Sequence, residues 1–500
     1  MTTYVLSIHQ RTVGTWAVIL DHKANVVASA FAEITQYFPQ LGWVEHDADE
    51  IWRVSLKVVA EALRNGRIAP EQIDAIGVAN QRDTTVFWNK KTGEPVGRAI
   101  VWQDQRTRPL CEQLIAKDKV NIETKTGMVI VPDATATKIR WLMENDQAIQ
   151  KGIARGELLC GTIDSWLIWK LSGGEAHLTD HSNASLTLLL NARSLTYDDE
   201  MLNDLGIPRE ILPELRRSSE FYTYTDPKAF FDVRVPIGCA GGDQQIAVFG
   251  QACIEAGMAK NTYSTGSFVL FNTDDRYLPP AGGLFSPVLW TIDETVVYGM
   301  EGKADVSGDL ILWLQDGLGI LHDVGEAEGL ASQVTDTQGV YFVPPFAGSD
   351  LVRTGTGSYN RGAILGVTRG VTKNHVVRAA LEALAYQTRD FVELFKKRVI
   401  EPGLRPQVLR ADGNIARSDF LLQFQADILG IPVERPMFTN TAALGAAYLA
   451  GLAVGYWSSV DEVVACWKRD RYFEPLISEE RREELYYGWQ RAVKQVKSPF

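Results

Sequence analysis

Hydrophobic and β-branched residues open the chain in three short runs, at 3–8, 15–21 and 26–34, with short polar connections between them. Such runs are typical of β-strands joined by turns, so the pattern predicts an antiparallel meander at the start of the chain. The spacing then becomes helical over 47–65, where acidic residues fill the first turn and Gly66 follows. This stretch is predicted to form an amphipathic helix that Gly66 ends.

Polar side chains come directly after the next predicted strands. A buried apolar run at 73–78 leads into Asn80-Gln81-Arg82-Asp83. A strand at 84–89 returns through 99–101 to Trp102-Gln103-Asp104. Because α/β proteins bind ligands at the carboxyl ends of their strands, these polar groups are expected in a cleft.

The strand pattern begins again after about residue 249. Strands are predicted at 257–263, 268–273 and 295–300, which repeats the opening meander about 250 residues further along the chain. Helices and strands then alternate. A helix is predicted at 373–397, a strand at 408–410, a helix that ends at Leu429, a strand at 431–434 and a helix at 441–455. The last of these helices is rich in alanine and glycine, which allows close packing against a sheet.

Length and composition agree with a two-domain protein. Five hundred residues are too many for one core, and the repeat places the domains at 1–248 and 249–500, with a cleft between them. The hydrophobic fraction of 45% is ample for two packed interiors. A net charge of −12, with acidic and basic residues interspersed, argues against nucleic acid or an anionic membrane as the main partner.

Cysteine usage and the first residues bear on location. The five cysteines are widely spaced and form no Cys-x-x-Cys pair, which indicates reduced thiols. The chain enters a strand pattern at once, without a basic segment, a long apolar run or a cleavage site. A cytoplasmic protein without a signal peptide or a membrane span is therefore expected.

A candidate catalytic group lies in the stretch from Gly241 to Gln245. An apolar run ends at two glycines, Asp243 and Gln244 follow, and an apolar segment resumes. This pattern can present a carboxylate at the carboxyl end of a strand, and Asp243 is the candidate general base. The alternative is that Asp243 only caps the following helix, since Asp is a favoured N-cap residue.

Several collinear stretches are too specific to be explained by composition. They are 39–47 (PQLGWVEHD), 80–85 (NQRDTT), 100–104 (IVWQD), 161–166 (GTIDSW), 242–245 (GDQQ), 260–263 (KNTY) and 423–430 (QFQADILG). Together they resemble the glycerol kinases of the FGGY carbohydrate kinase family, from about Tyr4 to Trp457. The resemblance implies two actin-like ATPase domains of the ribonuclease-H type, hinged about a cleft for ATP and a polyol.

The resemblance also implies the roles of individual residues. The acceptor pocket is implied to consist of Arg82, Asp83, Trp102, Asp243, Gln244 and Phe268. Asp243 would accept the proton of the acceptor hydroxyl while the γ-phosphoryl group transfers. ATP and Mg²⁺ are the implied cofactors, with nucleotide contacts at Thr12, Thr265, Gly266, Gly308 and Gly413.

More ordinary roles are open for some of these residues. Arg82 could form a surface salt bridge, and Trp102 and Phe268 could be core packing. The acceptor pocket also departs from the family at two positions, because Asp83 stands for the usual Glu and Asp133 for the usual Tyr. A shifted or enlarged pocket is expected.

The nucleotide half departs further from the family. His9 replaces the Asp of the first phosphate loop, and His is a poor substitute for a carboxylate near Mg²⁺. Arg11 replaces a Gly that lets the main chain approach phosphate. Other departures are Leu312, Asn414, Ile415, Ser418 and the whole segment 351–360. His9 could be a core histidine without a chemical role, and Arg11 could either point into solvent or fill the phosphate site and neutralise a bound anion.

Two functions are consistent with these residues. The first is an ATP-dependent kinase that phosphorylates a terminal hydroxyl of glycerol or a related small polyol, with impaired activity. The second is an inactive protein of the same fold that binds a polyol or a polyol phosphate as a regulatory or scaffolding subunit. The resemblance implies a homodimer or a homotetramer, since both are common in the family.

Overall fold

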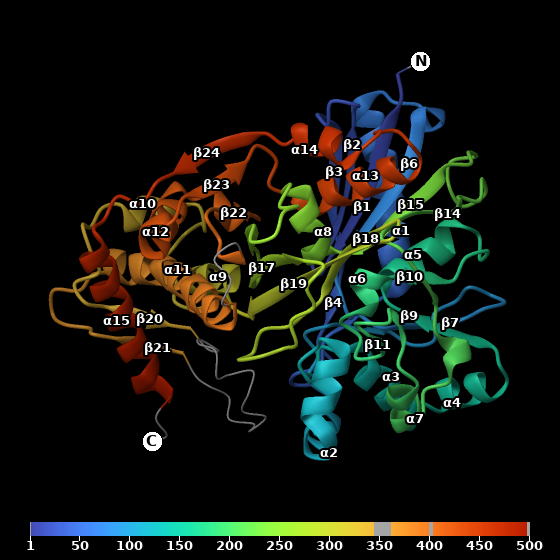
Figure 1. Ribbon diagram of the computed structural model, residues 1–500, viewed down its shortest axis with the longest axis horizontal. Helices are drawn as coiled ribbons and strands as arrows, with labels where there is room; N and C mark the ends of the chain where they lie inside the picture. Colours follow the sequence, from blue (N-terminus) through green and yellow to red (C-terminus); the bar gives the residue numbers. More distant parts are fainter. Residues whose placement is uncertain (1, 345–361, 400–403, 498–500) are drawn as a thin grey trace.

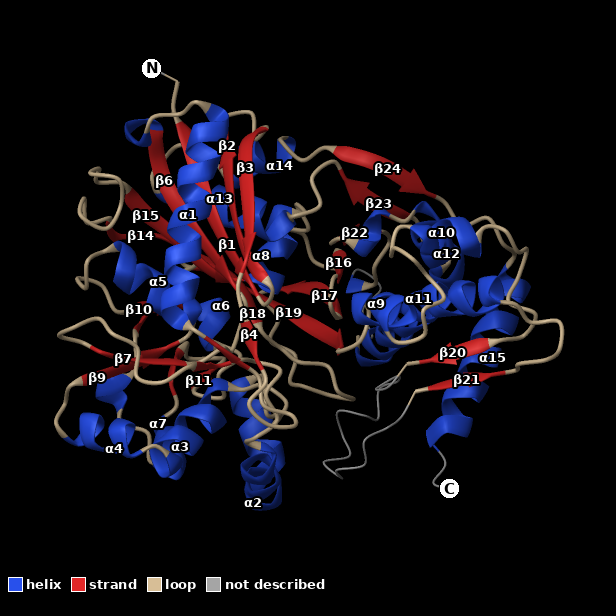
Figure 2. Cartoon of the chain, turned by 180° about the vertical axis from the view of Figure 1, so that it is seen from behind, coloured by secondary structure: helices blue, strands red, loops and turns tan. Residues whose placement is uncertain are grey.

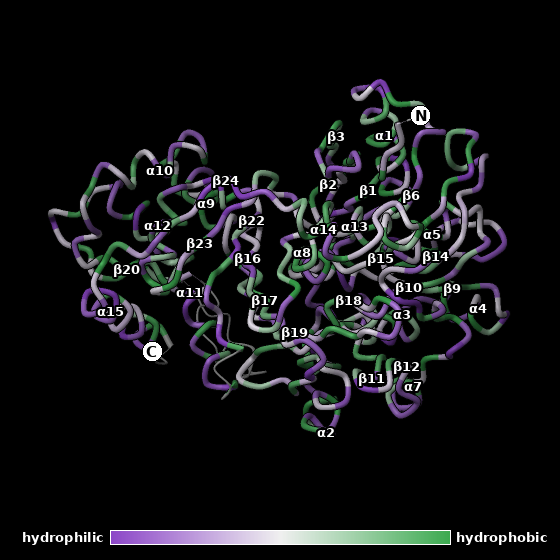
Figure 3. Tube along the Cα trace, turned by 45° about the horizontal axis from the view of Figure 1, so that its top comes forward, coloured by the Kyte–Doolittle hydropathy of each residue, from purple (hydrophilic) through white to green (hydrophobic). Residues whose placement is uncertain are grey.

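The computed structural model describes residues 2–344, 362–399 and 404–497. Figure 1 shows two parts side by side, and the tilted view of Figure 3 places β16, β17, β22 and α11 on one side and β1, β6 and β15 on the other.

The elements up to residue 250 are β1 (Tyr4–Arg11), β2 (Gly14–Leu20), β3 (Val26–Glu33), β4 (Gln36–Tyr37), β5 (Glu45–His46), α1 (Ala48–Gly66), β6 (Ile73–Asn80), β7 (Val86–Asn89), β8 (Ala99–Ile100), α2 (Arg108–Thr126), α3 (Thr135–Asn145), α4 (Gln147–Ala154), β9 (Leu158–Gly161), α5 (Ile163–Leu171), β10 (Leu178–Asp180), α6 (His181–Ala184), β11 (Leu190–Asn191), β12 (Thr196–Tyr197), α7 (Asp199–Leu205), β13 (Glu214–Arg216), β14 (Ser219–Tyr224), β15 (Pro236–Gly242) and α8 (Asp243–Gly250).

The second part of the chain contributes another set of strands and helices. They are β16 (Ala259–Tyr263), β17 (Ser267–Asp274), β18 (Val288–Ile292), β19 (Thr295–Ala304), α9 (Gly308–Asp316), α10 (Glu326–Ala331), β20 (Tyr341–Val343), β21 (Ala363–Leu365), α11 (Lys373–Arg398), β22 (Leu409–Asp412), α12 (Asp419–Leu429), β23 (Val433–Pro436), α13 (Thr441–Ala453), α14 (Val460–Ala465), β24 (Arg469–Phe473) and α15 (Glu479–Lys497).

The two predicted meanders are confirmed and belong to one sheet. β1, β2 and β3 pair antiparallel, and β6 adds parallel to β1. β16, β17 and β19 form the second antiparallel set. In the described part of the chain, thirteen strands of this sheet follow one another in the order β24-β23-β22-β16-β17-β19-β18-β14-β15-β6-β1-β2-β3. The two halves of this sheet meet at β14 and β18, where Ser219 pairs with Ile292.

Alternate side chains of β1 face opposite layers, because successive residues of a strand point to opposite sides. Leu6 and Ile8 belong to the core that α1 covers, and Val5 belongs to the core that α13 covers. In Figure 1, α13 lies among the strands of the first half although its residues come late in the chain, and Figure 2 shows α1 across the same strands. The sheet of the first half is therefore covered on both faces.

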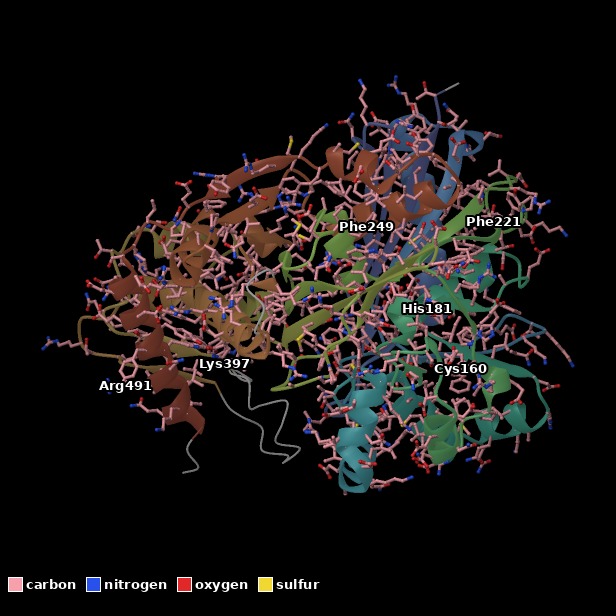
Figure 4. All side chains as sticks on the ribbon, in the orientation of Figure 1. Cys160, His181, Phe221, Phe249, Lys397 and Arg491 are labelled. Carbon is pink, nitrogen blue, oxygen red and sulfur yellow. The ribbon has the colours of Figure 1, made fainter. Side chains whose placement is uncertain are left out.

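α13 approaches this sheet as closely as its small residues predict. A Cβ atom on Gly77 of β6 would lie 2.1 Å from the main-chain oxygen of Ala446. A Cβ atom on Gly445 would lie 2.0 Å from the main-chain oxygen of Ile246, at the contact between α13 and α8. Phe249 of α8, labelled in Figure 4, is buried nearby and packs edge-on against Trp290 at 5.3 Å between ring centroids. Only glycine fits where two main chains meet at these distances.

Gly66 is the last residue of α1, as predicted, and Arg67 after it takes the left-handed conformation with φ 53°. A Cβ atom on residue 66 would lie 2.8 Å from the Ile68 side chain and 2.9 Å from the Cβ of Ala28, so close packing also favours glycine here. Other local predictions were wrong. Strand β18 was not predicted, and the predicted strand at 84–89 begins only at Val86. The segment 351–360 lies outside the described residues.

Two further predictions bear on the whole chain. All five cysteines are free thiols, so no disulfide joins them. Within the described ranges, no helix has both the length and the apolar run that crossing a bilayer requires.

Candidate active site

A cavity of about 350 Å³ lies where the carboxyl ends of β1, β6, β15, β16 and β22 meet. Residues from both halves of the sequence line this cavity. The lining includes His9, Arg11, Thr12, Arg82, Asp83, Trp102, Asp133, Asp243, Gln244, Thr262, Thr265, Phe268, Lys303, Asp412, Gly413, Arg417 and Asn440. The cavity brings together every predicted acceptor residue, and of the predicted nucleotide residues it brings in Thr12, Thr265 and Gly413.

Asp243 is the first residue of α8 and does not serve as its cap. Gly242 is the N-cap residue, and no α8 main-chain N–H donates to the Asp243 carboxylate among the described residues. The Asp243 side chain, 15% exposed, instead faces Arg82 and His9. Burial alone would raise the pKa of this carboxyl, but His9, Arg82 and Lys260 outweigh burial and hold the pKa below its usual value. Asp243 is therefore an ionised carboxylate in the cavity at neutral pH.

His9 is buried, as the core interpretation predicts, yet it belongs to the site. Its Nδ1–H donates to Oδ1 of Asn440 at 2.7 Å, because an amide oxygen can only accept. Its Nε2 lies 3.9 Å from Oδ2 of Asp243 and has no hydrogen-bond partner in the described part of the chain. The imidazole is thus fixed on one side and directed at the candidate base on the other.

Arg82 forms a buried ion pair and not a surface salt bridge. Its two terminal nitrogens donate to the Glu301 carboxylate at 2.6 and 2.7 Å, and its Nε lies 3.6 Å from Oδ1 of Asp243. Burial alone would lower the pKa of Arg82, but the charge and hydrogen bonds of Glu301, together with the charges of Asp243 and Asp83, raise the pKa overall. Glu301 belongs to β19, so this bidentate pair connects the two halves of the chain.

Asp83 lies in a strained and enclosed position. It has φ 64°, in the left-handed region that costs a non-glycine residue about 1–3 kcal/mol. Its main-chain oxygen accepts from Thr85, Thr135 and Lys138 at 3.0–3.2 Å, which holds this conformation. The Oδ1 atom is buried and has no hydrogen-bond partner among the described residues. Burial raises the pKa of the carboxyl to about 7.

Trp102 and Phe268 form an apolar wall, with their rings 6.3 Å apart and edge-on. The indole N–H of Trp102 donates to the hydroxyl of Thr12 at 2.9 Å. Thr12, predicted to contact nucleotide, is therefore joined to the acceptor wall. The ammonium of Lys303 lies 4.5 Å from the centre of the Trp102 ring. Lys303 also contacts Asp133, the residue that departs from the family's Tyr.

Gln244 and Asp412 are connected through a buried lysine. Lys260 Nζ donates to Gln244 Oε1 and to the Thr262 hydroxyl, both at 2.6 Å. Thr262 donates in turn to Asp412 at 2.5 Å, and Asp412 also accepts from Gln251 and Thr441. Burial lowers the pKa of Lys260 to about 8. This network fixes the amide of Gln244 beside the candidate base.

Arg11 lines the cavity and does not point away into bulk solvent. It is partly buried and close enough to Asp243 and Asp412 for both carboxylates to raise its pKa, although burial lowers the pKa by more. Its guanidinium makes no hydrogen bond or ion pair with any other described residue. Arg417, exposed on the same cavity, likewise forms no ion pair in the described part of the chain.

Two predicted nucleotide residues do not line the cavity. A Cβ atom on Gly266 would lie 2.6 Å from the main-chain oxygen of Ala304, and one on Gly308 would lie 2.5 Å from that of Ser264. Gly413, which does line it, has φ 89° and would place a Cβ atom 2.2 Å from the main-chain oxygen of Tyr263. Close packing of the protein with itself accounts for all three glycines. A nucleotide contact at these positions stays a prediction.

Sequence reasoning missed several residues of the site. No role in the site was predicted for Glu301, Lys303, Lys260 or Asn440, although each contacts another residue of the cavity. The predicted strand at 295–300 stopped short of Glu301 and Lys303, which alternate on the last part of β19 (Thr295–Ala304) and put two charges on one face of the strand. Asn440 precedes the small-residue helix, where Asn is a favoured cap.

The carboxylates of the site do not form a metal cage. Among the described residues, no three His, Cys, Asp or Glu side chains lie close enough together to hold a metal ion. Asp243 and Asp412 are the carboxylates near Arg11, and three donors already occupy the oxygens of Asp412. Mg²⁺ binds in many kinase sites through one or two carboxylates together with the phosphate oxygens of the nucleotide, and only that arrangement fits these residues.

Comparison with known proteins decides the family. The pattern of the "FGGY family of carbohydrate kinases, N-terminal domain" matches residues 4–250, and that of its C-terminal domain matches 259–454. The chain belongs to the FGGY family of carbohydrate kinases. Both the predicted family and the predicted fold of two actin-like domains are confirmed. The membership also assigns this FGGY chain to the phosphotransferases, as expected.

Individual relatives match over the full length. Glycerol kinase of Geobacillus sp. (strain WCH70) is 48% identical over 498 residues, with 99% of each chain covered. Glycerol kinase of Thermus thermophilus is 48% identical over 495 residues, again with 99% of each covered. Among solved structures, Plasmodium falciparum glycerol kinase with ADP has a TM-score of 0.90 and 31% identity, covering 100% of this chain and 99% of that one. Xylulose kinase of Lactobacillus acidophilus, at 21% identity and a TM-score of 0.82 with 99% and 97% covered, shares the fold.

Proposed function

We propose that this FGGY kinase transfers the γ-phosphoryl group of MgATP to a terminal hydroxyl of glycerol or a related small polyol. The observation that carries the proposal is the position of Asp243, a carboxylate in the cavity between Arg82 and His9 and beside an apolar wall. A polyol needs hydrogen-bonding groups on one side and apolar surface on the other, and the cavity supplies both. The full-length glycerol kinase relatives support the choice of acceptor.

Asp243 has the properties of a general base for this reaction. Its pKa is held below the usual value, so the carboxylate is free of a proton at neutral pH. When the acceptor hydroxyl attacks the γ-phosphorus, the O–H proton passes to Asp243 and ADP leaves with the electrons of the broken P–O bond. Gln244, held by Lys260, lies beside Asp243 to orient the acceptor.

Arg11 can bind an anion in the same cavity. A guanidinium with no direct partner among the described residues, near Asp243 and Asp412, can offer two parallel N–H donors to a phosphoryl group. In this proposal MgATP is the second substrate, and Arg11 and Thr265 contact its phosphates. In this arrangement 1–248 supplies most of the polyol site, to which 249–500 adds Phe268, and both parts of the chain contribute to the nucleotide site.

A second function is favoured by the same two residues. His9 and Arg11 occupy the first phosphate loop, and Arg11 takes space that a phosphate needs if the main chain itself must approach it. In that case the protein binds a polyol or a polyol phosphate without turnover, as a regulatory or scaffolding subunit. Glycerol 3-phosphate would then bind with its phosphate at Arg11.

Calorimetry and a turnover assay separate the two functions. The proposed kinase binds glycerol and MgATP and forms a phosphate ester that ³¹P NMR detects. The binding protein takes up glycerol or glycerol 3-phosphate, shows no stabilisation by saturating MgATP, and forms no ester. Asp243→Asn serves as the matched control, because it keeps the shape of the side chain and removes the base.

A further inference from the structure

The two cations that line the acceptor end of the cavity, Arg82 and Lys303, are already paired with carboxylates. The guanidinium of Arg82 is held by both oxygens of Glu301 and lies 3.6 Å from Asp243. The ammonium of Lys303 contacts Asp133 and lies 2.8 Å from Oδ1 of Asp305. One lysine is therefore shared by two acidic groups, and its ammonium is not free to pair with a carboxylate of a ligand.

These charges lie in a part of the cavity that is shielded from bulk solvent. The side chain of Lys303 is 10% exposed and that of Asp133 is 14% exposed. The ammonium also lies over the Trp102 ring, which forms part of the apolar wall. Charges interact more strongly in such surroundings than in bulk water, so the sign of the local charge matters for a ligand.

Asp83 adds a further acidic group beside this pair. It lines the same cavity, and its Oδ1 has no hydrogen-bond partner in the described ranges. Lys138, the nearby buried cation, donates to the main-chain oxygens of Asp83 and Asp133 and not to their carboxylates. Lys138 therefore fixes the main chain here and is enclosed behind it.

Two other arginines of the cavity have the opposite character. Arg11 and Arg417 both line it, and neither forms an ion pair with another described residue. An anion can gain a direct partner at these arginines and cannot gain one at Arg82 or Lys303 without displacing an existing carboxylate.

We propose that the Asp133–Lys303 ion pair makes the acceptor end selective for uncharged polyols and rejects hydroxy acids. A hydroxyl group can donate to Asp133 or Asp83 and accept from Lys303, whereas a carboxylate at the same place meets Asp133 and Asp305 with no free cation. Placing like charges together in a shielded site is costly. This inference rests on the proposed function, because it concerns the acceptor of that reaction.

Calorimetry with glycerol and D-glycerate, in the absence of nucleotide, tests the proposal. The wild-type protein is expected to bind glycerol at least about tenfold more tightly than glycerate. Asp133→Asn keeps the hydrogen-bonding shape and releases the Lys303 ammonium from one carboxylate. This variant is expected to shift the preference at least about tenfold toward glycerate.

Two further variants make the result specific. Asp133→Asn combined with Lys303→Met is expected to lose the gain for glycerate, because the gain depends on the released ammonium. Asp316→Asn changes the net charge equally from an exposed position on α9 and is expected to leave the preference unchanged. Circular dichroism melts verify that each variant is folded.

The outcomes also separate this inference from the proposed function. A wild-type protein that binds glycerate as tightly as glycerol, or binds neither, overturns the inference, as does an Asp133→Asn variant with an unchanged preference. The proposed function fails on a different reading, namely a wild-type protein with the expected binding preference that forms no phosphate ester from glycerol and MgATP.

Discussion

His9 Nε2 lies 3.9 Å from Asp243 Oδ2, so an imidazole stands beside the carboxylate that is proposed to accept the acceptor proton. Asn440 fixes the ring from its other side through a hydrogen bond of 2.7 Å. The imidazole lowers the pKa of Asp243, together with Arg82 and against the effect of burial. His9 is thus a positioning and tuning residue for the base and not simply part of the core.

Replacing His9 should change the pH dependence of turnover. His9→Gln removes one contribution that lowers the pKa of Asp243, so this pKa rises. Turnover needs the ionised carboxylate, and the acidic limb of the profile of kcat/KM against pH is therefore expected to move to higher pH. His22→Gln, at an exposed histidine, is the control and should leave the profile in place. An unmoved acidic limb in His9→Gln would show that the imidazole does not tune Asp243.

Replacing Arg11 distinguishes the two proposed functions by whether the use of MgATP becomes weaker or stronger. If its guanidinium holds a transferring phosphoryl group, Arg11→Ala raises the KM for MgATP by about tenfold or more and leaves the Kd for glycerol unchanged. Arg53→Ala, at an exposed position of α1, is the control. A rise in turnover, in Arg11→Ala or in His9→Asp with Arg11→Gly, would instead show that these side chains obstruct the nucleotide.

The stability of the protein is expected to depend on pH through the Asp83 carboxyl. The pKa of its carboxyl is about 7 in the folded protein, against an ordinary 3.8. Asp83 therefore loses its proton at a lower pH in the unfolded chain than in the folded protein. Between about pH 4 and 7, this group makes the free energy of unfolding fall as the pH rises. Asp83→Asn removes the effect. The variant should gain stability over the wild type by about 2–4 kcal/mol between pH 4 and 7. Urea denaturation at several pH values measures the difference, and a constant difference would contradict the prediction.

Much of this fold follows from local sequence pattern, and much of the site does not. Alternation of apolar residues predicts β1, β2 and β3, and helical spacing with Asp47 before it predicts α1, because each signal lies within one element. Glycine positions were less predictable. Gly66 ends α1 as predicted, but its close packing against Ile68 and Ala28 and the left-handed conformation of Arg67 carry no signal in the local pattern.

The unpredicted parts of the site depend on contacts between distant residues. Lys303 contacts Asp133 across 170 positions, and His9 contacts Asn440 across 431. No local pattern specifies such a pair, because its geometry is set by how β19 and α13 fold back against the first half of the chain. Residue types at strand ends indicate where a site forms, whereas the partners that set its charge emerge only in three dimensions.

The contact between β6 and α13 gives a prediction about stability alone. Gly77→Ala would bring a Cβ atom within 2.1 Å of the main-chain oxygen of Ala446, and neither element can move freely. A loss of about 3 kcal/mol or more is expected, measured by urea denaturation. Gly329→Ala, in α10 with no atom within 4 Å of the added Cβ, is the control and should be neutral or stabilising. Equal effects of the two substitutions would contradict the close approach.

The central claim is that Asp243 acts as the base of an ATP-dependent polyol kinase. The most direct test is ³¹P NMR of glycerol and MgATP with the wild-type protein and with Asp243→Asn, at concentrations that calorimetry shows to saturate glycerol binding in both. The account predicts a phosphate ester and ADP with the wild type, and a rate lower by at least about 10²-fold in the variant with its glycerol affinity largely kept. A wild-type protein that binds glycerol and forms no ester, or a variant that turns over at the wild-type rate, would contradict it.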